Sequence, residues 1–406
     1  MTALSELLAD KTAIKKLPSS FGLLRNLKTV SLSGCKGQSS KSWMSRFSSW
    51  ILPKGSNAIN LLPSSVSGLC YLTRLVLSDC NLSEGGIPID LGSLSSLKTL
   101  NLSRNNFHNL PRCIGRLPKL NALWLSKCTS LQSITELPTS LRSLIADGCT
   151  SMERLSIQSI QKSSPFFSLA RCHKLVEIQG LESLESTPSI HMEGCYNLAN
   201  DFRKSLLQFL FKGDGRCASL PPDSEIPNWF SLQKIGSSIS FHVPTHSVGE
   251  IQGLLVWATY TTKEESDMMI IGAPYAIIKN KTKGHQDTFV PTFYATHVTC
   301  EDNSCVWRIP LKRYQFVMES GDEIESIIVG EEIKVKKCGI HLLVNEPDVL
   351  VEYGTMVQQV DFDTASAKDG KIVCAKRVRD DNEAGTSTPN EEKFPKRLRI
   401  EFEAQE

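Results

Sequence analysis

The amino-acid sequence predicts a leucine-rich-repeat solenoid, followed by an antiparallel β-sandwich or barrel and a disordered, charged tail. A frame of the form L-x-x-L-x-L-x-x-C/N recurs through the first half of the 406-residue chain, mostly every 21 to 25 residues. Short alternating apolar runs replace it from residue 218, and dense mixed charge follows from about residue 361. A chain of this length has room for two or three such parts.

The repeat frame is plainest in LTRLVLSDCNL (72–82), LKTLNLSRNNF (97–107) and LNALWLSKCTSL (120–131). The leucines of each frame point inward, and the residues between them lie outward on a short parallel strand. One repeat cannot bury its own leucines, so neighbouring repeats must stack, and we expect the solenoid to cover 1–197. The last position of the frame falls at Thr12, Cys35, Cys80, Asn105, Cys128, Cys149, Cys172 and Cys195.

One step between these positions, from Cys35 to Cys80, is 45 residues long, about twice the others. It predicts a degenerate repeat within 41–65, and the loss of the frame in KSWMSRFSSWILPKGSNAIN indicates an insertion. Leu-Pro pairs end the outer arcs of several repeats, and proline opposes a long helix, so we expect an irregular convex side. The pairs stand at 17–18, 62–63, 110–111 and 137–138.

The cysteines predict buried thiols rather than disulfides or zinc ligands. The chain has 13 of them, an odd number, and six lie at the repeat position where a small residue turns inward. Their spacing is repeat-length and not the C-x₂₋₄-C of a zinc site. Reduced thiols, together with the lack of a basic start and apolar core typical of a secretory signal, predict the cytoplasm or nucleus.

The concave face, which carries the strands, is the expected binding surface, because it is broad and offers no deep pocket. Trp124 is the leading candidate, since exposed aromatic residues and arginines are enriched at binding hot spots. The mixed charge of the face favours a protein partner over nucleic acid. The alternative is that these are ordinary solvated strand residues. The outward positions are Arg74, Asp79, Asn101, Arg104, Trp124, Lys127, Ile145, Asp147, Arg171, His191 and Glu193.

The segment after the repeats predicts a helix over 198–217 that caps the solenoid, because its apolar residues follow a helical period. From 218 to 358 the runs SSISFHV, LLVWATY, MMIIGAPYAII, CVWRIP and CGIHLLV predict antiparallel strands.

Two stretches of this second part resemble the post-repeat domain of plant intracellular immune receptors with TIR, nucleotide-binding and leucine-rich-repeat parts. They are PDSEIPNWFSLQKIGSSISFHVP (222–244) and VKKCGIHLLVNEPD (335–348). The resemblance implies a jelly-roll or immunoglobulin-like domain that contacts pathogen effector proteins together with the repeats. The first stretch is then a domain joint, in which Trp229 and Phe230 bury against the solenoid end and the first strands. The joint motif comprises Pro222, Ser224, Glu225, Ile226, Pro227, Trp229 and Phe230.

The function that the resemblance implies is recognition of a pathogen effector protein, without catalysis and without a cofactor. The alternative is a regulatory or adaptor protein, a truncated receptor or decoy, that binds the nucleotide-binding or TIR domains of a host receptor. The sequence contains no P-loop and no G-x-G-x-x-G, H-E-x-x-H or C-x-x-C motif. Because the chain begins inside the repeats, we expect either the C-terminal part of a larger receptor or a stand-alone truncated product.

The tail, 359–406, is expected to be disordered, because it combines high charge with few apolar residues. A basic cluster in it is a candidate nuclear import signal, and the alternative is a solvated polyampholyte. Flanking acids and a net charge of only +2 for the chain argue against nucleic-acid binding, and no apolar run approaches the length of a membrane span. The candidate signal comprises Lys393, Lys396, Arg397 and Arg399.

Overall fold

The computed structural model divides the chain into two compact units, which we describe separately. The first comprises Met1–Asp223 and Thr296–Thr299, and the second comprises Ser224–Ala295 and Cys300–Glu406. The structure describes residues 4–36, 61–161, 165–184, 188–199, 202, 205–208, 217–220, 225–245, 251–262, 269–270, 274–291, 296–297, 302–311, 316–330, 333–344, 370–373 and 401–404.

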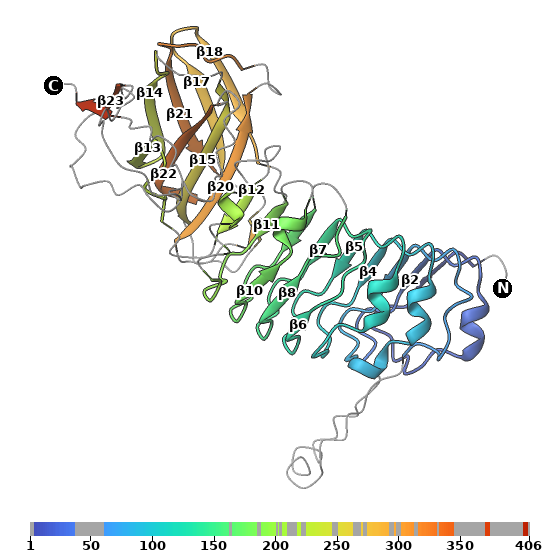
Figure 1. The fold of residues 1–406 in the computed structure, drawn as a ribbon. Coiled ribbons are helices and arrows are strands. Elements are labelled where there is room, and N and C mark those ends of the chain that lie inside the picture. Colours follow the sequence, from blue (N-terminus) through green and yellow to red (C-terminus); the bar gives the residue numbers. More distant parts are fainter. Residues whose placement is uncertain are drawn as a thin grey trace, which may run out of the picture. The chain divides into compact units, whose positions relative to one another are not determined.

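The first unit is built on a parallel sheet in which each repeat contributes one short strand (Figure 1). The middle residue of nearly every strand is a buried aliphatic or aromatic side chain, from Val30 on β2 to Ile190 on β11, both with 0% exposure. The leucine-rich-repeat fold predicted from the frame is therefore present. In spatial order the strands are β1 (Glu6–Leu8), β2 (Thr29–Ser31), β3 (Arg74–Val76), β4 (Thr99–Asn101), β5 (Ala122–Trp124), β7 (Ser143–Ile145), β9 (Phe166–Ser168), β11 (Ser189–His191) and β12 (Cys217–Leu220).

The long step between Cys35 and Cys80 does not contain a further repeat strand. Strands β2 and β3 pair directly, with Val30 opposite Leu75. A degenerate repeat would place a strand between them, so that expectation was wrong, and the extra length belongs to an insertion within one repeat. The inserted residues 37–60 lie outside the described part of the chain.

The side of the solenoid away from this sheet is more regular than the proline pattern predicted. Early repeats carry short 3₁₀ helices, and later repeats carry a second parallel sheet that the sequence analysis missed. The sequence does contain a signal for this second sheet, the pattern C-x-x-L/M-x-x-L/I that starts at the last position of the frame. In the repeat of Cys128, the pattern places Leu131 and then Ile134 of this sheet in the core. The elements are η1 (Ser19–Leu23), η4 (Glu84–Gly86), η5 (Ile89–Ser93), η6 (Arg112–Arg116), η7 (Leu181–Ser183), β6 (Ser133–Ile134), β8 (Arg154–Ser156) and β10 (Glu177–Gln179).

The cysteine positions of the repeats form a column of buried hydrogen-bond donors. Each thiol donates to a backbone carbonyl of the preceding repeat, across 3.0 to 3.3 Å. Burial raises the pKa of Cys80 to about 11 and that of Cys128 to about 12, so both thiols stay protonated. Protonated thiols donate hydrogen bonds and are poor nucleophiles, which fits the structural role predicted for them.

Asn105 occupies the same column and bridges two repeats with four hydrogen bonds. Its Oδ1 accepts from the amides of Cys80 and Leu82, at 3.1 and 3.0 Å. Its Nδ2 donates to the carbonyls of Leu77 and Leu102, each at 2.8 Å. A cysteine replaces only one of these bonds, so Asn105 is the most demanding member of the column.

Residues after the last frame continue the first unit. Phe202 and 205–208 are helical, and Leu198, Phe202 and Leu206 are buried, as a capping helix requires. The predicted bounds were wrong at both ends, because residues 198–199 are not helical and Cys217 already belongs to β12 (Cys217–Leu220); the other residues of the predicted helix lie outside the described ranges. Strand β12 then pairs in parallel with β11, with Ser219 opposite His191. The structure thus places β12, which we had grouped with the strands of the second part, in the first unit.

The second unit contains two larger antiparallel sheets, ordered β20-β15-β22-β13 and β14-β21-β17-β18 (Figure 1). Strands β14, β17 and β21 alternate buried and more exposed residues, so each offers one apolar face. Strands β14 and β21 also lie against β22 of the other sheet. The strands are β13 (Leu232–Ile235), β14 (Ser238–His242), β15 (Ile251–Thr262), β17 (Tyr275–Asn280), β18 (His285–Phe289), β20 (Asn303–Pro310), β21 (Glu323–Val329) and β22 (Ile333–Val344).

Two further short strands are β16 (Met269–Ile270) of the second unit and β19 (Thr296–His297) of the first. In the tail, β23 (Gly370–Val373) pairs antiparallel with β24 (Glu401–Ala404), which differs from the disorder expected there. For the tail residues outside these two strands, disorder stays a prediction.

Removal of the Asn105 side chain should destabilise the solenoid strongly. Asn105→Ala leaves two amides and two carbonyls without their partner in the core, and each unsatisfied buried group costs about 1–3 kcal/mol. We expect a loss of about 3 kcal/mol or more in the free energy of unfolding, measured by urea denaturation. Lys119→Ala, at an exposed position between η6 and β5, is the control and should cost less than about 0.5 kcal/mol.

Candidate functional site

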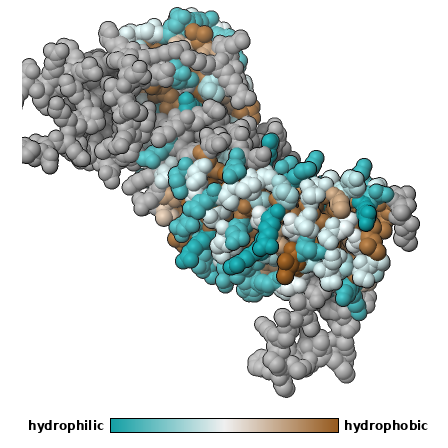
Figure 2. All heavy atoms as spheres, turned by 45° about the vertical axis from the view of Figure 1, so that its right-hand side comes forward, coloured by the Kyte–Doolittle hydropathy of each residue, from teal (hydrophilic) through white to brown (hydrophobic). Residues whose placement is uncertain are grey.

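The candidate site is the strand face, by which we mean the outward side chains of the first sheet and of the turns that flank its strands. Arg74, Asn101, Trp124 and Ile145 lie at the first or last position of β3, β4, β5 and β7. Side chains alternate along a strand, so these residues point away from the buried leucines. The structure therefore places these four as the sequence predicted. Figure 2 shows one face of the molecule, in which hydrophilic side chains stand in rows with hydrophobic ones among them.

Four predicted residues lie in turns rather than on strands. Asp79, Arg104, Lys127 and Arg171 have φ between 56° and 60°, the left-handed region, directly before the Cys/Asn position. The equivalent residue in other repeats is glycine, at 34, 148 and 194. Every repeat needs this left-handed residue to turn its chain inward, and five repeats use a charged side chain for it, because Lys11 before Thr12 has the same conformation, with a φ of 56°. These charges consequently flank the strand face at its turn edge.

Two predicted surface residues, His191 and Glu193, are buried. Their exposed fractions are 1% and 0%. The ring of Phe166 lies edge-on against His191, with 5.1 Å between centroids, and β12 places Ser219 alongside. The sequence analysis did not expect a further strand next to the last repeat, which is why it assigned both residues to the surface.

Glu193 is the third member of a recurring acid–serine pattern. Asp10 Oδ1 accepts from the Ser31 hydroxyl at 2.6 Å, and Asp147 Oδ1 accepts from the Ser168 hydroxyl at 2.6 Å. Glu193 has the same place in its repeat, and Ser219 has the place of the serine. Burial raises the pKa of Glu193 to about 7, and Ser219 lowers that pKa in part. Neither carboxyl oxygen reaches a donor with hydrogen-bond geometry among the described residues.

An apolar strip crosses the middle of the strand face. Trp124 on β5 is opposite Ile145 on β7. Ala122 on β5 is opposite Ser143 on β7, which in turn is opposite Phe166 on β9. Ala122, Trp124, Ile145 and Phe166 are all partly exposed, although three of them have large or branched apolar side chains. The sequence analysis missed Ala122 and Phe166, which the repeat frame marks as outward residues.

The joint motif belongs to the core of the second unit. Ile226 and Phe230 are each 4% exposed, and they pack over Gly339 of β22. A Cβ at Gly339 would lie 2.9 Å from Ile226 Cγ2 and 3.1 Å from Phe230 Cδ1, so the motif requires glycine there. Phe230 also meets Trp257 edge-on, at 5.7 Å between ring centroids. Glu225 is exposed, and Pro222 and Ser224 lie outside the described residues.

The motif also surrounds His341 of β22. Trp229 meets the imidazole edge-on at 5.2 Å between centroids, and the Ser231 hydroxyl is 3.0 Å from Nδ1. Burial lowers the pKa of His341 to about 4, against a smaller opposing effect of a backbone hydrogen bond at Trp229. The residue as a whole is half-buried, but its ring lies among the aromatic side chains of Trp229 and Phe230, which shield it from water. His341 is therefore neutral at physiological pH.

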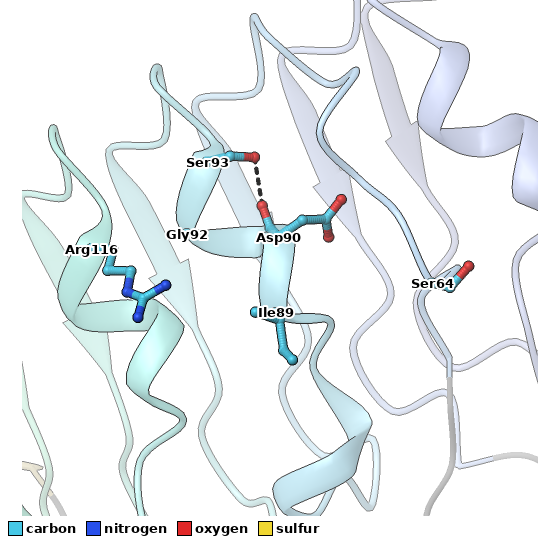
Figure 3. A pocket seen from close by; sticks show the side chains of 6 residues that line it. All are labelled: Ser64, Ile89, Asp90, Gly92, Ser93 and Arg116. Carbon is cyan, nitrogen blue, oxygen red and sulfur yellow. Dashed lines mark hydrogen bonds between the residues drawn. The ribbon is translucent and has the colours of Figure 1, made fainter.

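A shallow depression of about 560 Å³ lies beside the 3₁₀ helices η5 and η6 (Figure 3). The Asp90 carboxylate points away from Arg116 there, toward the preceding repeat, where Oδ2 accepts from the Ser65 hydroxyl at 2.6 Å and the Val66 amide at 2.9 Å. Ser93 donates to the Asp90 carbonyl at 2.6 Å. The polar groups thus stabilise the turn, and the lining brings no nucleophile together with a base.

The other predicted features are described only in part. In the turn of 279–288, Lys281 pairs with Glu323 at 3.1 Å and Lys283 with Glu319 at 2.9 Å, so these charges hold the hairpin. The candidate import signal at Lys393, Lys396, Arg397 and Arg399 lies outside the described residues. Within the described ranges, no cluster of three metal-ligating side chains occurs, and no helix has the length and hydropathy to span a bilayer.

Comparison with known proteins identifies leucine-rich repeats and a similarity to plant resistance proteins. The leucine-rich-repeat family model matches residues 71–94 and 96–117. The disease resistance-like protein DSC1 of Arabidopsis thaliana is 31% identical over 61% of the chain and 18% of its own length. The TMV resistance protein N of Nicotiana glutinosa is 34% identical over 45% of the chain and 15% of its own length. The disease resistance protein RPS4B of Arabidopsis thaliana is 25% identical over 66% of the chain and 22% of its own length.

The chain thus spans about a fifth of the length of the curated relatives it matches. Among solved structures, a leucine-rich-repeat protein of Leptospira interrogans, LIC12759, is 16% identical over 52% of this chain and 72% of that one, with a TM-score of 0.21. A TM-score this low supports no conclusion about the fold of this chain. The resemblance to plant resistance proteins with leucine-rich repeats, expected from the sequence motifs, is confirmed.

Glu193 should make the first unit less stable as pH rises. A carboxyl with a higher pKa in the folded state keeps its proton there from about pH 4.5 to about 7, so the free energy of unfolding falls across that window. Glu193→Gln should raise the free energy of unfolding by up to about 3 kcal/mol at about pH 8, and change it little at about pH 4.5. Hydrogen exchange of peptides from β9 and β11 measures this effect. Equal protection of variant and parent at both pH values would contradict it.

His341 should act in the opposite direction on the second unit. An imidazole with a lowered pKa binds its proton in the unfolded chain first, so stability is complete above about pH 6.5 and decreases toward pH 4. We expect a loss of about 2 kcal/mol or less, because the residue is partly exposed. Hydrogen exchange of β15 and β22 peptides tests this. His341→Gln should flatten the pH dependence of those peptides and leave β9 and β11 unchanged.

Proposed function

We propose that the chain is a recognition module of plant innate immunity that contacts a pathogen effector protein through the strand face and the second unit. The observation that carries this proposal is the similarity to plant disease resistance proteins over 61% to 66% of the chain. The partly exposed Trp124 and its apolar neighbours support the strand face as the contact surface, because such residues are enriched at hot spots.

The second unit is proposed to be a β-sandwich of the jelly-roll or immunoglobulin-like type that begins at Ser224 rather than at 218. Its two main sheets are antiparallel, and β17 and β21 alternate buried with more exposed residues. Two sheets with one apolar face each bury those faces by packing together. The joint motif supports this unit from inside through Ile226 and Phe230, so effector contact would fall to its loops.

The proposed mechanism is binding without covalent chemistry. Contact with an effector stabilises one conformation of a receptor, and the population shifts toward that conformation by as much as the differential affinity allows. We propose the cytoplasm and nucleus as the location. The eleven cysteines in the described part of the chain are free, which is consistent with a reducing compartment.

A binding screen with matched surface variants tests the function. The purified full chain is immobilised and exposed to a panel of secreted pathogen proteins and, separately, to host TIR and nucleotide-binding domains. We expect a pathogen protein to be retained, and Trp124→Ala to weaken that binding by about tenfold or more. Ile89→Ala is the control, because Ile89 is an equally apolar residue on η5, 82% exposed and outside the strand face. Retention of host receptor domains alone would replace this function with the regulatory one.

A further inference from the structure

We propose that the strand face binds an acidic amphipathic helix of its protein partner. This proposal rests on the proposed recognition function and specifies the chemistry of what is recognised. It depends on three features: two rows of basic side chains, the apolar strip between them, and the engagement of the nearby acids within the solenoid.

The first basic row stands directly before the strands. Lys28, Lys98 and Arg142 immediately precede β2, β4 and β7, and all three are exposed. Arg74, the first residue of β3, is exposed as well. Among the residues that the structure describes, none of the four forms an ion pair. Their charges are therefore available to a partner.

The second basic row stands after the strands, in the left-handed turns. Arg104 follows β4, Lys127 follows β5 and Arg171 follows β9. Because the turn conformation recurs in each repeat, these residues hold the same place in successive repeats. The strand face is thus bordered by cations along both edges.

The acids near these rows are already engaged. Asp79 pairs with Lys36 at 2.7 Å. Asp147 Oδ1 accepts from the Ser168 hydroxyl at 2.6 Å and from the Ala170 amide at 3.0 Å. The cations of the two rows thus outnumber Asp79 and Asp147 at the strand face, although the hydrogen bonds to Asp147 come from neutral donors and leave its charge in place, and the net charge of the whole chain is only +2.

The dimensions favour a helix. Within one repeat, the residue of the first row and the residue of the second row are six positions apart in the sequence, as Lys98 and Arg104 are. The distance between their Cα atoms is therefore at most ~20 Å, the length of six residues of extended strand. A helix with its side chains is ~10–12 Å across, and the flexible stems of lysine and arginine can lean over the remaining gap. Neighbouring strands are ~4.8 Å apart, so Trp124 on β5 and Phe166 on β9 are about two spacings apart across the sheet, close to two turns of a helix. An apolar stripe at positions i, i+4 and i+7 would therefore meet one strand after another.

Nucleic acid fits the same face less well. Ile145 and Ala122 offer no aromatic surface for bases, and the cations stand in two separate rows rather than along one backbone track. A glutamate-flanked apolar stripe matches both rows at once. Protein is therefore the favoured class, and nucleic acid is an outcome of the test.

Fluorescence anisotropy with the full chain tests the proposal. The probe is a labelled peptide of about 18 residues that forms a helix with a leucine stripe flanked by glutamates. We expect binding that weakens with added salt and weakens at least about tenfold when the same residues are scrambled. Failure of the ordered peptide to bind more tightly than the scrambled one, or tighter binding of an oligothymidine, would overturn the proposal.

Charge reversal locates the surface. Lys98→Glu with Lys127→Glu should weaken binding by about tenfold or more, because it removes one cation from each row. Arg112→Glu with Arg116→Glu, on the exposed 3₁₀ helix η6, changes the net charge equally and should leave binding within about twofold. An equal effect of both pairs would reduce the interaction to net charge and exclude the site. If Trp124→Ala weakens binding of an effector but neither charge-reversal pair changes it, the recognition function is supported and the acidic-helix proposal is rejected.

Discussion

The structure of the first unit depends on one constraint, which is that the chain must turn inward at the end of every strand without leaving backbone groups unsatisfied in the leucine core. Two adjacent residues meet that constraint in each repeat. The first takes the left-handed conformation, and the second, a cysteine or Asn105, sends hydrogen-bond donors to the preceding repeat. The repeats stack in register because each of these bonds links neighbours. Outward positions such as Arg74 and Trp124 take no part in these bonds, whereas Ser31 and Ser168 are tied to acids of the preceding repeats.

The second unit solves a different problem, the start of an antiparallel core after a repeat array. Ile226 and Phe230 reach over Gly339, and Trp229 lies against His341, so a short segment with a turn at 227–230 covers the face of β22. Packing in the second unit thus accounts for the aromatic residues of the joint motif. The two units also respond to protons in opposite directions, because one buries a carboxyl at Glu193 and the other an imidazole at His341.

The sequence predicted correctly those features that repeat with the leucine-rich-repeat frame. The buried leucines, the thiol column and the outward place of Trp124 all follow from the frame. Sequence reasoning failed where the decisive contact comes from outside the period. Burial of His191 and Glu193 accompanies β12, a strand without the frame, and the absence of a repeat in the long step is visible only in the direct pairing of β2 with β3. The hydrogen bond that fixes the Asp147 carboxylate to Ser168 of the next repeat is likewise beyond what spacing can predict.

The left-handed turn position also has an evolutionary consequence. A non-glycine residue there costs about 1–2 kcal/mol of backbone strain, yet Arg104, Lys127 and Arg171 all accept it. Glycine is always a less strained alternative, so a mutation that discards a charge at this position gains stability, and one that acquires a charge loses some. Each of these side chains belongs to one repeat, so a charge at the turn edge can be gained or lost one repeat at a time while the buried leucines and thiols stay as they are.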